Sequence, residues 1–488
     1  MPTIRRLALL LPTTLALVAG TAPPAHAVTN AALASQVAAV LRDSRVTAST
    51  NGTLVADAAT GSELAGRNAW QSAVPASNMK IVTAGAALRT LGSGYRFKTE
   101  AIARWSVRAD GSVPSSVYLK GYGDPSLMES DLRALAQNLR ARGVRRFTGN
   151  LVADGSFFDG AYYNSAWGTQ NASQYYAPQI AGLSLAPNAD FDAGTVIVTA
   201  YPTRSGAAAR ITVTPASAAS YVRIVNKVKT GRSSSVGVAR TLGTNTITVT
   251  GSVATSASGG SRRWVAVHRP DLYAATVFRA QLAAVGITVA GPTVAGVTPA
   301  AGRVIVATDT SQTIGELMRP FLKLSNNAIA EHLLKTMGAR TSAPGTTAKG
   351  VAYLRDYLRA AGAPLTGTAF ADGSGLARSN RLTPRALTRA LLYAQRQPWF
   401  GAFYAGLPVA GATDRMTGGT LSTRMRGTAA AGRVMAKTGS LSGVTSLSGY
   451  ITAVDGRRYV FSMLSNYRSS SPRPVEDRLA ITIASHRR

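Results

Sequence analysis

This 488-residue sequence contains no cysteine, so disulfide bonds, thiolate nucleophiles and cysteine-based zinc sites are excluded together. Histidine is scarce, with four in the whole chain, and 22 acidic residues stand against 53 lysines and arginines. We find no pattern of metal ligands, and we expect neither a metal nor a cofactor.

The shortage of acidic residues leaves a formal net charge of +31, or +29 once the two arginines of residues 1–27 are removed. Such an excess can indicate nucleic-acid binding. Here the basic residues are scattered, without a dense run or a recognisable nucleic-acid motif, and the chain carries an export signal. We therefore predict no nucleic-acid partner, and the charge favours attraction to an anionic cell wall.

Long hydrophobic runs are also lacking. The apolar stretch after Arg5 and Arg6 is interrupted by prolines and is shorter than the roughly 20 residues that span a bilayer. It ends in the small-residue site Ala25-His26-Ala27, which predicts a signal peptide, residues 1–27, rather than a membrane anchor. The arginine pair leaves both the Sec and the twin-arginine export routes open. We expect a secreted mature chain, outside the cytoplasm and without a transmembrane segment.

The remaining length exceeds what one core usually supports, which indicates several domains. Residues 29–43 have a helical periodicity, 52–61 read as a strand, and the apolar run 79–91 reads as a buried helix. Residues 194–254 alternate in the strand pattern, whereas helical patterns return after Ile314 and precede three strand-like runs and a last helix. We predict one α/β domain made from both ends of the chain, with a largely β insertion between them.

The four histidines offer little support for a Ser-His-Asp triad. His26 falls in the predicted signal peptide, His486 is near the end, His268 lies in the insertion, and His332 is on an apolar helix where a structural role is favoured. The Gly-x-Ser-x-Gly elbow of α/β-hydrolases is also missing. A serine nucleophile would therefore need a different base.

A lysine with a lowered pKa is the alternative base. Lys80 is the only lysine with a serine, Ser77, three residues before it, and this spacing places both side chains on one helix face. The predicted helix start also supplies backbone N–H groups and a positive dipole end for an oxyanion. We predict that Ser77 is a nucleophile and Lys80 its base.

Two further motifs follow in order. Ser325-Asn326-Asn327 offers a hydroxyl that could pass a proton and an amide that could hold a substrate, although alone it is equally typical of a helix cap or a surface loop. Lys437-Thr438-Gly439 precedes Ser440 on a predicted strand, where Gly439 allows close approach, Lys437 and Thr438 can bind a carboxylate, and the Ser440 N–H can join an oxyanion hole. The same tripeptide, Lys229-Thr230-Gly231, lies in a predicted turn of the insertion, and we favour the later copy.

The ordered set Ser-x-x-Lys, Ser-x-Asn, Lys-Thr-Gly is found in class A β-lactamases and penicillin-binding proteins. With PASNMKIVTAGAAL, LKLSNNAIAEHLLK, DGSGLARSNRLTP and AKTGSLSGVTSLSGYI, the sequence resembles the D-alanyl-D-alanine carboxypeptidase/endopeptidase family, the low-molecular-mass class C penicillin-binding proteins. GYGDPSL in the insertion is similar too. The resemblance spans nearly the whole mature chain.

The resemblance implies an α/β fold, a serine β-lactamase/penicillin-binding (transpeptidase-like) domain with a helical subdomain, interrupted by a long mainly-β two-domain insertion. We expect the catalytic domain at 28–94 and 305–488, inserted domain II at 95–193 and 255–304, and the all-β inserted domain III at 194–254.

The resemblance also implies roles for individual residues. Ser77 would be acylated, Lys80 would be its base, Ser325 would relay the proton, and Asn327 would orient the substrate. Lys437 and Thr438 would bind the terminal carboxylate, and the N–H groups of Ser77 and Ser440 would form the oxyanion hole. Arg378 would border the pocket for the stem-peptide side chain.

The implied function is that of a serine peptidase acting on peptidoglycan stem peptides, which removes terminal D-Ala, cleaves D,D-cross-links, or does both, and is inhibited covalently by β-lactam antibiotics. A secreted β-lactamase shares the motifs, but the 248 positions from Ser77 to Ser325 are more than compact β-lactamases allow. A non-catalytic wall-binding protein would be expected to have lost a motif residue, and all are present. The preferred diamino acid stays open, because residues 164–176 contain none of the acids that some relatives use there.

Overall fold

The computed structural model describes residues 31–302 and 304–487, so the predicted signal peptide lies outside the described residues. Its central element is a five-stranded antiparallel sheet of order β17-β18-β19-β1-β2, built from both ends of the chain. The strands are β1 (Thr50–Asp57), β2 (Glu63–Arg67), β17 (Val434–Leu441), β18 (Val444–Thr452) and β19 (Arg458–Asn466). β1 pairs with β19 from Thr50↔Asn466 to Asp57↔Tyr459, which joins the two ends as the sequence predicts.

Helices cover both faces of this sheet, so β18 and β19 are buried along almost their whole length. On one face α1 (Ala31–Leu41) and α12 (Arg473–Ser485) share an apolar cluster with Phe461 and Met463. On the other face α3 (Met79–Leu91) and α9 (Pro384–Ala394) pack around Val460 and Leu464. We call this sheet and its helices the main body.

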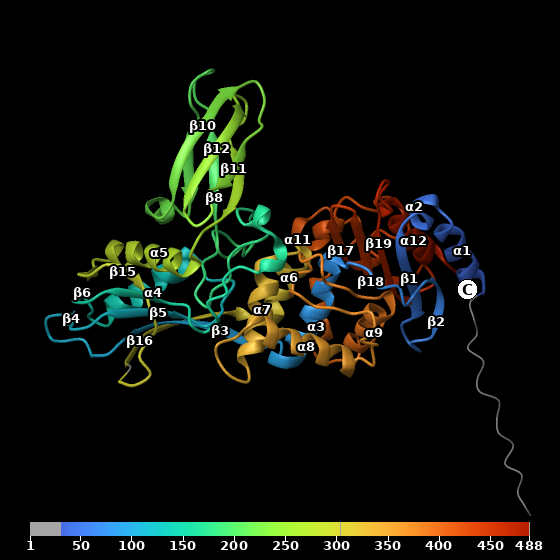
Figure 1. Ribbon diagram of the computed structural model, residues 1–488, viewed down its shortest axis with the longest axis horizontal. Helices are drawn as coiled ribbons and strands as arrows, with labels where there is room; N and C mark the ends of the chain where they lie inside the picture. Colours follow the sequence, from blue (N-terminus) through green and yellow to red (C-terminus); the bar gives the residue numbers. More distant parts are fainter. Residues whose placement is uncertain (1–30, 303, 488) are drawn as a thin grey trace, which may run out of the picture.

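A helical layer extends the second face (Figure 1). It contains α6 (Ile314–Lys323), α7 (Asn327–Ala339), α8 (Thr347–Ala360), α10 (Phe400–Gly406) and the single turn α11 (Arg415–Gly418). The side chain of Thr313 accepts from the backbone N–H of Glu316, whose carboxylate accepts from the N–H of Thr313, and this capping box starts α6. Asn326 caps α7 by accepting from the N–H of Ile329.

The insertion, which lies between α3 and α6, begins with a mixed sheet of order β15-β7-β5-β3-β16. Its strands are β3 (Arg96–Ala103), β5 (Val117–Gly121), β7 (Leu151–Asp154), β15 (Thr293–Ala295) and β16 (Val304–Thr313). Helices α4 (Glu129–Ala141) and α5 (Pro270–Ala284) pack against it, and the short strands β4 (Ser112–Val113), β6 (Arg146–Phe147) and β14 (Thr288–Val289) form a second small sheet. The antiparallel pair β3–β16 brings the start and the end of the insertion together beside the main body.

Two three-stranded sheets complete the insertion. One has the order β13-β8-β9, from β8 (Thr195–Tyr201), β9 (Arg210–Thr214) and β13 (Ser261–Ala266). The other, β10-β12-β11, contains β10 (Arg223–Gly231), β11 (Gly237–Arg240) and β12 (Thr246–Ala254), and it projects away from the main body (Figure 1). Lys229-Thr230-Gly231 ends β10 in parallel pairing with β12, so our prediction of a turn there is wrong.

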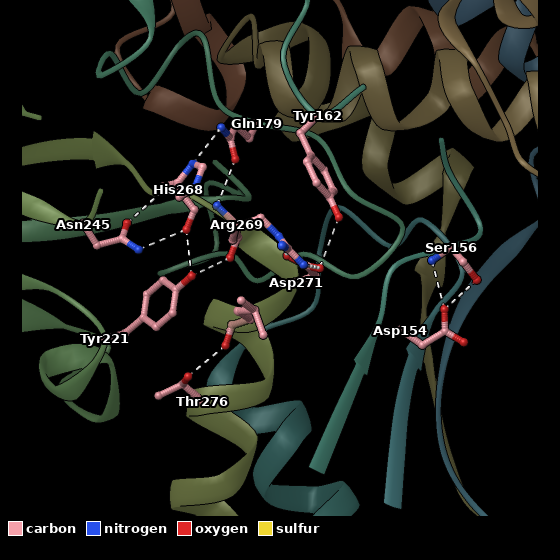
Figure 2. Close-up of polar contacts among 11 residues, drawn as sticks. Asp154, Ser156, Tyr162, Gln179, Tyr221, Asn245, His268, Arg269, Asp271 and Thr276 are labelled. Carbon is pink, nitrogen blue, oxygen red and sulfur yellow. Dashed lines mark hydrogen bonds and ion pairs between the residues drawn. The ribbon is translucent and has the colours of Figure 1, made fainter. Parts of the chain in front are cut away.

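A polar junction joins the projecting strands to the start of α5 (Figure 2). The Tyr221 hydroxyl donates to the carbonyl oxygens of His268 and Arg269 at 2.7 and 2.8 Å, and Asn245 exchanges two hydrogen bonds with the backbone of His268. Arg269 has a φ of 58° and binds Asp271 through two guanidinium nitrogens, at 2.9 and 2.6 Å. These bonds fix His268 in the insertion as a structural residue.

Within the described ranges, the helices are all too short or too polar to cross a lipid bilayer.

Candidate active site

Ser77 lies on a single 3₁₀ turn, Ala76–Asn78, directly before α3. Two glycines from distant segments press against this turn. A Cβ on Gly375 would lie 1.9 Å from the Ala76 carbonyl oxygen, and one on Gly439 would lie 2.8 Å from the Pro75 carbonyl oxygen. Only glycine permits such close contact. The two glycines therefore allow the loop after Asp372 and strand β17 to pack directly against the turn that carries Ser77.

Lys80 is fully buried beneath Ser77. Its Nζ donates to Ser77 Oγ at 3.0 Å, to Asn327 Oδ1 at 2.6 Å and to the Ser374 carbonyl oxygen at 2.6 Å. Burial lowers the pKa of Lys80 to about 7, while the carboxyl groups of Asp372 and Glu331 act in the opposite direction. Near neutral pH a substantial fraction of Lys80 is a free amine within hydrogen-bonding distance of the serine hydroxyl.

Two buried acids, Asp372 and Glu331, organise the loop beside Lys80. Glu331 Oε1 accepts from the N–H groups of Gly373 and Ser374, at 3.0 and 2.8 Å. Asp372 accepts four hydrogen bonds, from the N–H groups of Gly375 and Ala377, Asn380 Nδ2 and Trp167 Nε1. Burial raises the pKa of Glu331 to about 8. Our sequence reasoning gave neither acid a role. The available signal was the position of Asp372 at the start of the glycine-rich stretch DGSGLAR.

Ser325 occupies the turn between α6 and α7, in a left-handed backbone conformation with φ 60°. It is partly exposed, whereas Asn326 is buried and caps α7. The helix-cap interpretation therefore holds for Asn326. Asn327 connects two parts of the site, because its Oδ1 accepts from Lys80 and its Nδ2 donates to the Tyr176 carbonyl oxygen at 2.6 Å.

Strand β17 forms the opposite side of the site. Lys437 is fully buried, its Nζ donates to the Thr438 carbonyl oxygen at 2.8 Å, and burial together with the nearby Lys80 holds the pKa of Lys437 well below its usual range. The Thr438 hydroxyl donates to Thr420 Oγ1 at 2.7 Å, and Ser440 is exposed. Lys437 is thus poorly solvated and has no carboxylate among its described partners.

These groups surround a cavity of about 770 Å³. Of the predicted site residues, five line it: Ser77, Ser325, Asn327, Arg378 and Ser440. Lys80 contacts Ser77 and Asn327 directly, and Lys437, Thr438 and Gly439 precede Ser440 on β17. Arg378 is exposed, and its guanidinium donates to the Ser442 carbonyl oxygen at 2.7 Å.

The remaining wall includes residues that our sequence reasoning did not name individually, some of them within 164–176, the stretch that we examined for an acid. Trp167, Tyr175, Tyr176 and Asp192 belong to the insertion, and Arg415 belongs to α11. Burial raises the pKa of Asp192 to about 7. Asp192 and Arg415 lie outside 164–176 and carry no motif, so no sequence signal pointed to these two.

The histidines among the described residues lie outside the cavity wall. His332 is buried on α7, where its Nδ1 lies 2.8 Å from the Ala328 carbonyl oxygen and burial lowers its pKa to about 4. Its structural role follows the sequence prediction. Residues 31–302 and 304–487 also contain no group of three or more acidic or histidine side chains arranged to hold a metal ion.

The sequence is similar to known proteins over most of its length. Residues 33–485 match the model of the D-Ala-D-Ala carboxypeptidase 3 (S13) family. The chain is 37% identical over 460 residues to the D-alanyl-D-alanine carboxypeptidase of Actinomadura sp. strain R39, covering 93% of this chain and 85% of that protein. It is 25% identical over 403 residues to the D-alanyl-D-alanine carboxypeptidase DacB of Haemophilus influenzae, covering 80% of each.

The fold is also found among solved structures. The crystal structure of penicillin binding protein 4 (dacB) from Haemophilus influenzae superposes with a TM-score of 0.76 at 23% identity, over 91% of this chain and 97% of that one. This similarity confirms the predicted fold class, a transpeptidase-like penicillin-binding domain with a long insertion.

Proposed function

Because this chain belongs to the D-Ala-D-Ala carboxypeptidase 3 (S13) family, which makes it a serine peptidase, we propose that it hydrolyses D-Ala-D-Ala ends and D,D-cross-links of peptidoglycan through an acyl-enzyme on Ser77. The observation that carries the proposal is the 3.0 Å hydrogen bond between Lys80 Nζ and Ser77 Oγ. A lysine with a pKa of about 7 at that distance can accept the serine proton.

In the acylation step, Lys80 takes the Ser77 proton as Oγ attacks the carbonyl carbon of the penultimate D-Ala. The developing oxyanion accepts from the N–H groups of Ser77 and Ser440, on the 3₁₀ turn and on β17. The proton on Lys80 passes through the Ser325 hydroxyl to the leaving nitrogen, so the C–N bond breaks and D-Ala departs as an amine. Water then attacks the ester, giving up its proton to the same lysine, and restores Ser77.

Lys437 and Thr438 suit the terminal carboxylate of the substrate. The side chain of Lys437 lacks a counter-charge among its described partners, and an incoming carboxylate would supply one and favour the ammonium form. Thr438 adds a hydroxyl from the same strand. This pairing favours substrates that end in a free D-amino acid.

The cavity also accommodates more than a dipeptide, since about 770 Å³ lies near the upper part of the range for small-molecule sites. Arg378 borders one part of it and Asn327 orients the bound peptide backbone. β-Lactams would acylate Ser77 in the same way, because their strained amide resembles the D-Ala-D-Ala bond. Export through residues 1–27, attraction of the basic surface to an anionic wall, and the domain boundaries given above are further parts of the proposal.

The test is acylation by a labelled penicillin combined with digestion of purified monomeric and cross-linked muropeptides, followed by mass spectrometry. Ser77→Ala should abolish both the label and the products, whereas Ser205→Ala, on an exposed turn of the insertion, should change neither. A labelled peptide that maps away from Ser77 would refute the assignment. Rapid multiple turnover of the penicillin, with muropeptides left intact, would instead indicate a β-lactamase.

A further inference from the structure

The insertion does more than border the cavity, because one of its segments is hydrogen-bonded to the parts of the main body that surround Lys80. The bonds involve α7 and the loop 371–380. They run from Lys335 Nζ to Asp159 Oδ1 (2.7 Å), from Asn164 Nδ2 to the Ala371 carbonyl oxygen (2.9 Å), from Trp167 Nε1 to Asp372 Oδ2 (2.8 Å), and from Asn327 Nδ2 to the Tyr176 carbonyl oxygen (2.6 Å).

Trp167 makes the most central of these contacts. It closes a 3₁₀ turn capped by Asn164, its side chain is 3% exposed, and it packs against Ala177 of the insertion and Ala377 of the loop. The carboxylate oxygen that accepts from its indole N–H also accepts from the Ala377 N–H at 2.7 Å. Trp167 therefore fixes the Asp372 carboxylate from outside the main body.

The loop held in this way carries an acceptor of Lys80. Asp372 closes the loop by accepting from the Gly375 N–H, and the Ser374 carbonyl oxygen between them accepts from Lys80 Nζ. A second acceptor, Asn327 Oδ1, belongs to a side chain whose other end is bound by the Tyr176 carbonyl oxygen. Both acceptors of Lys80 other than Ser77 Oγ are thus connected to the insertion, Asn327 directly and Ser374 through Asp372 of the same loop.

We propose that Trp167 is a positioning residue for Lys80, acting through Asp372 and its loop, and that the insertion thereby aligns the amine with the Ser77 hydroxyl. The inference rests on the proposed function, which makes Lys80 the base. It assigns to the insertion a part in the chemical step, in addition to shaping access to the cavity.

The proposal has a consequence for titration. Burial lowers the pKa of Lys80, and the nearby carboxyl groups of Asp372 and Glu331 raise it. The Ser374 and Asn327 oxygens bind the ammonium form and so favour it. Lys437 is the neighbouring basic group, and its own pKa is lowered by burial and by Lys80. If the loop shifts so that the Ser374 oxygen and the Asp372 carboxylate move away while Lys80 stays buried, the pKa of Lys80 falls. The acid limb of the acylation profile should then move to lower pH, while the plateau rate falls because the amine is less well aligned.

The experiment compares Trp167→Phe with Trp264→Phe in the full-length protein. Phenylalanine keeps a ring but removes the indole donor, and Trp264 is the matched control because its Nε1, buried in β13 of the insertion, has no hydrogen-bond partner among the described residues. We measure the limiting acylation rate with a chromogenic cephalosporin, its half-saturation concentration, and the second-order acylation constant from pH 5 to 9. Trp167→Phe should lower the limiting rate about tenfold and shift the acid limb to lower pH, with Trp264→Phe unchanged.

A higher half-saturation concentration with an unaltered limiting rate and acid limb would overturn the proposal, since Trp167 would then act only as part of the cavity wall. Equal behaviour of the two variants would overturn it too. If Trp167→Phe fails to fold, 3-benzothienylalanine at position 167 keeps the indole shape without the N–H and must give the same loss. Lys80→Ala provides the separate check: acylation that survives it refutes the proposed base, whatever Trp167 does.

Discussion

Gly439→Ala tests whether strand β17 must touch the turn that carries Ser77. A Cβ at this position would lie 2.1 Å from Ser446 Oγ, 2.8 Å from the Pro75 carbonyl oxygen and 3.1 Å from Ala76 Cβ. Ser446 can rotate away, but its hydroxyl donates to that same Pro75 oxygen at 2.7 Å and would lose the bond. The backbone atoms cannot rotate, so β17 and the turn must separate.

The expected size of the effect follows from these contacts. Relief of the overlap costs about 1–3 kcal/mol, and the buried Ser446 hydroxyl, which loses its acceptor, adds about 1–3 kcal/mol. To reach ordinary van der Waals distance, the new Cβ and the Pro75 carbonyl oxygen must move apart by about half an ångström or more. Displacements approaching 1 Å in a catalytic site lower the reaction rate about 10²-fold. We therefore expect acylation to slow by 10- to 100-fold, alongside a lower melting temperature.

The second Lys-Thr-Gly copy supplies the control. A Cβ on Gly231 would meet only Ser252 Cβ, at 3.8 Å, so Gly231→Ala should alter the free energy of unfolding by less than about 0.5 kcal/mol and leave acylation unchanged. Stopped-flow acylation and thermal unfolding of the two variants provide the comparison. If Gly439→Ala acylates at the wild-type rate, β17 does not form the wall of the site that we describe.

Three further predictions follow from the same site. Lys437→Ala should slow acylation and peptide hydrolysis about 10²-fold or more, because it removes the side chain proposed to bind the substrate carboxylate. The exposed Lys229→Ala should have little effect, and equal stopped-flow rates for the two variants would mean that the third motif is misplaced. Because burial lowers the pKa of Lys80 to about 7 and the free amine is the base, the second-order acylation constant should rise with pH through about 7, and a profile flat from pH 5 to 9 would argue against that base. Thr313→Ala should destabilise the protein by about 1 kcal/mol through loss of the capping box while leaving the acylation rate unchanged, as thermal unfolding and penicillin labelling can check.

Local sequence patterns predicted the elements that depend on local causes. The helix expected at 79–91 is observed at Met79–Leu91, because an Ala-rich apolar run ends at Gly92, which has a φ of 87°. The three final strands and the Asp-Gly turn near 455 follow from alternation and turn chemistry. The Lys229 segment was predicted wrongly because its partner strand, β12, is parallel and is reached only after another strand.

The site could be predicted only in part for a related reason. Ser77 and Lys80 are three residues apart, so helical geometry alone brings them together. Trp167 and Asp372 are 205 residues apart, and neither lies in a periodic pattern that would indicate their contact. The roles of the individual site residues stay predictions until the variants are measured.

The pairing of β1 with β19 also has a consequence for how the protein becomes active during synthesis. Ser77, Lys80 and Ser325 all precede β17, the strand packed against the turn that carries Ser77, and the sheet cannot close until residues 458–466 are available. Contacts so distant in sequence form late and slowly. An unfinished chain would thus carry Ser77 without a complete cleft around it, so the acylation that we propose for Ser77 should become possible in one step, when the last strands join the first.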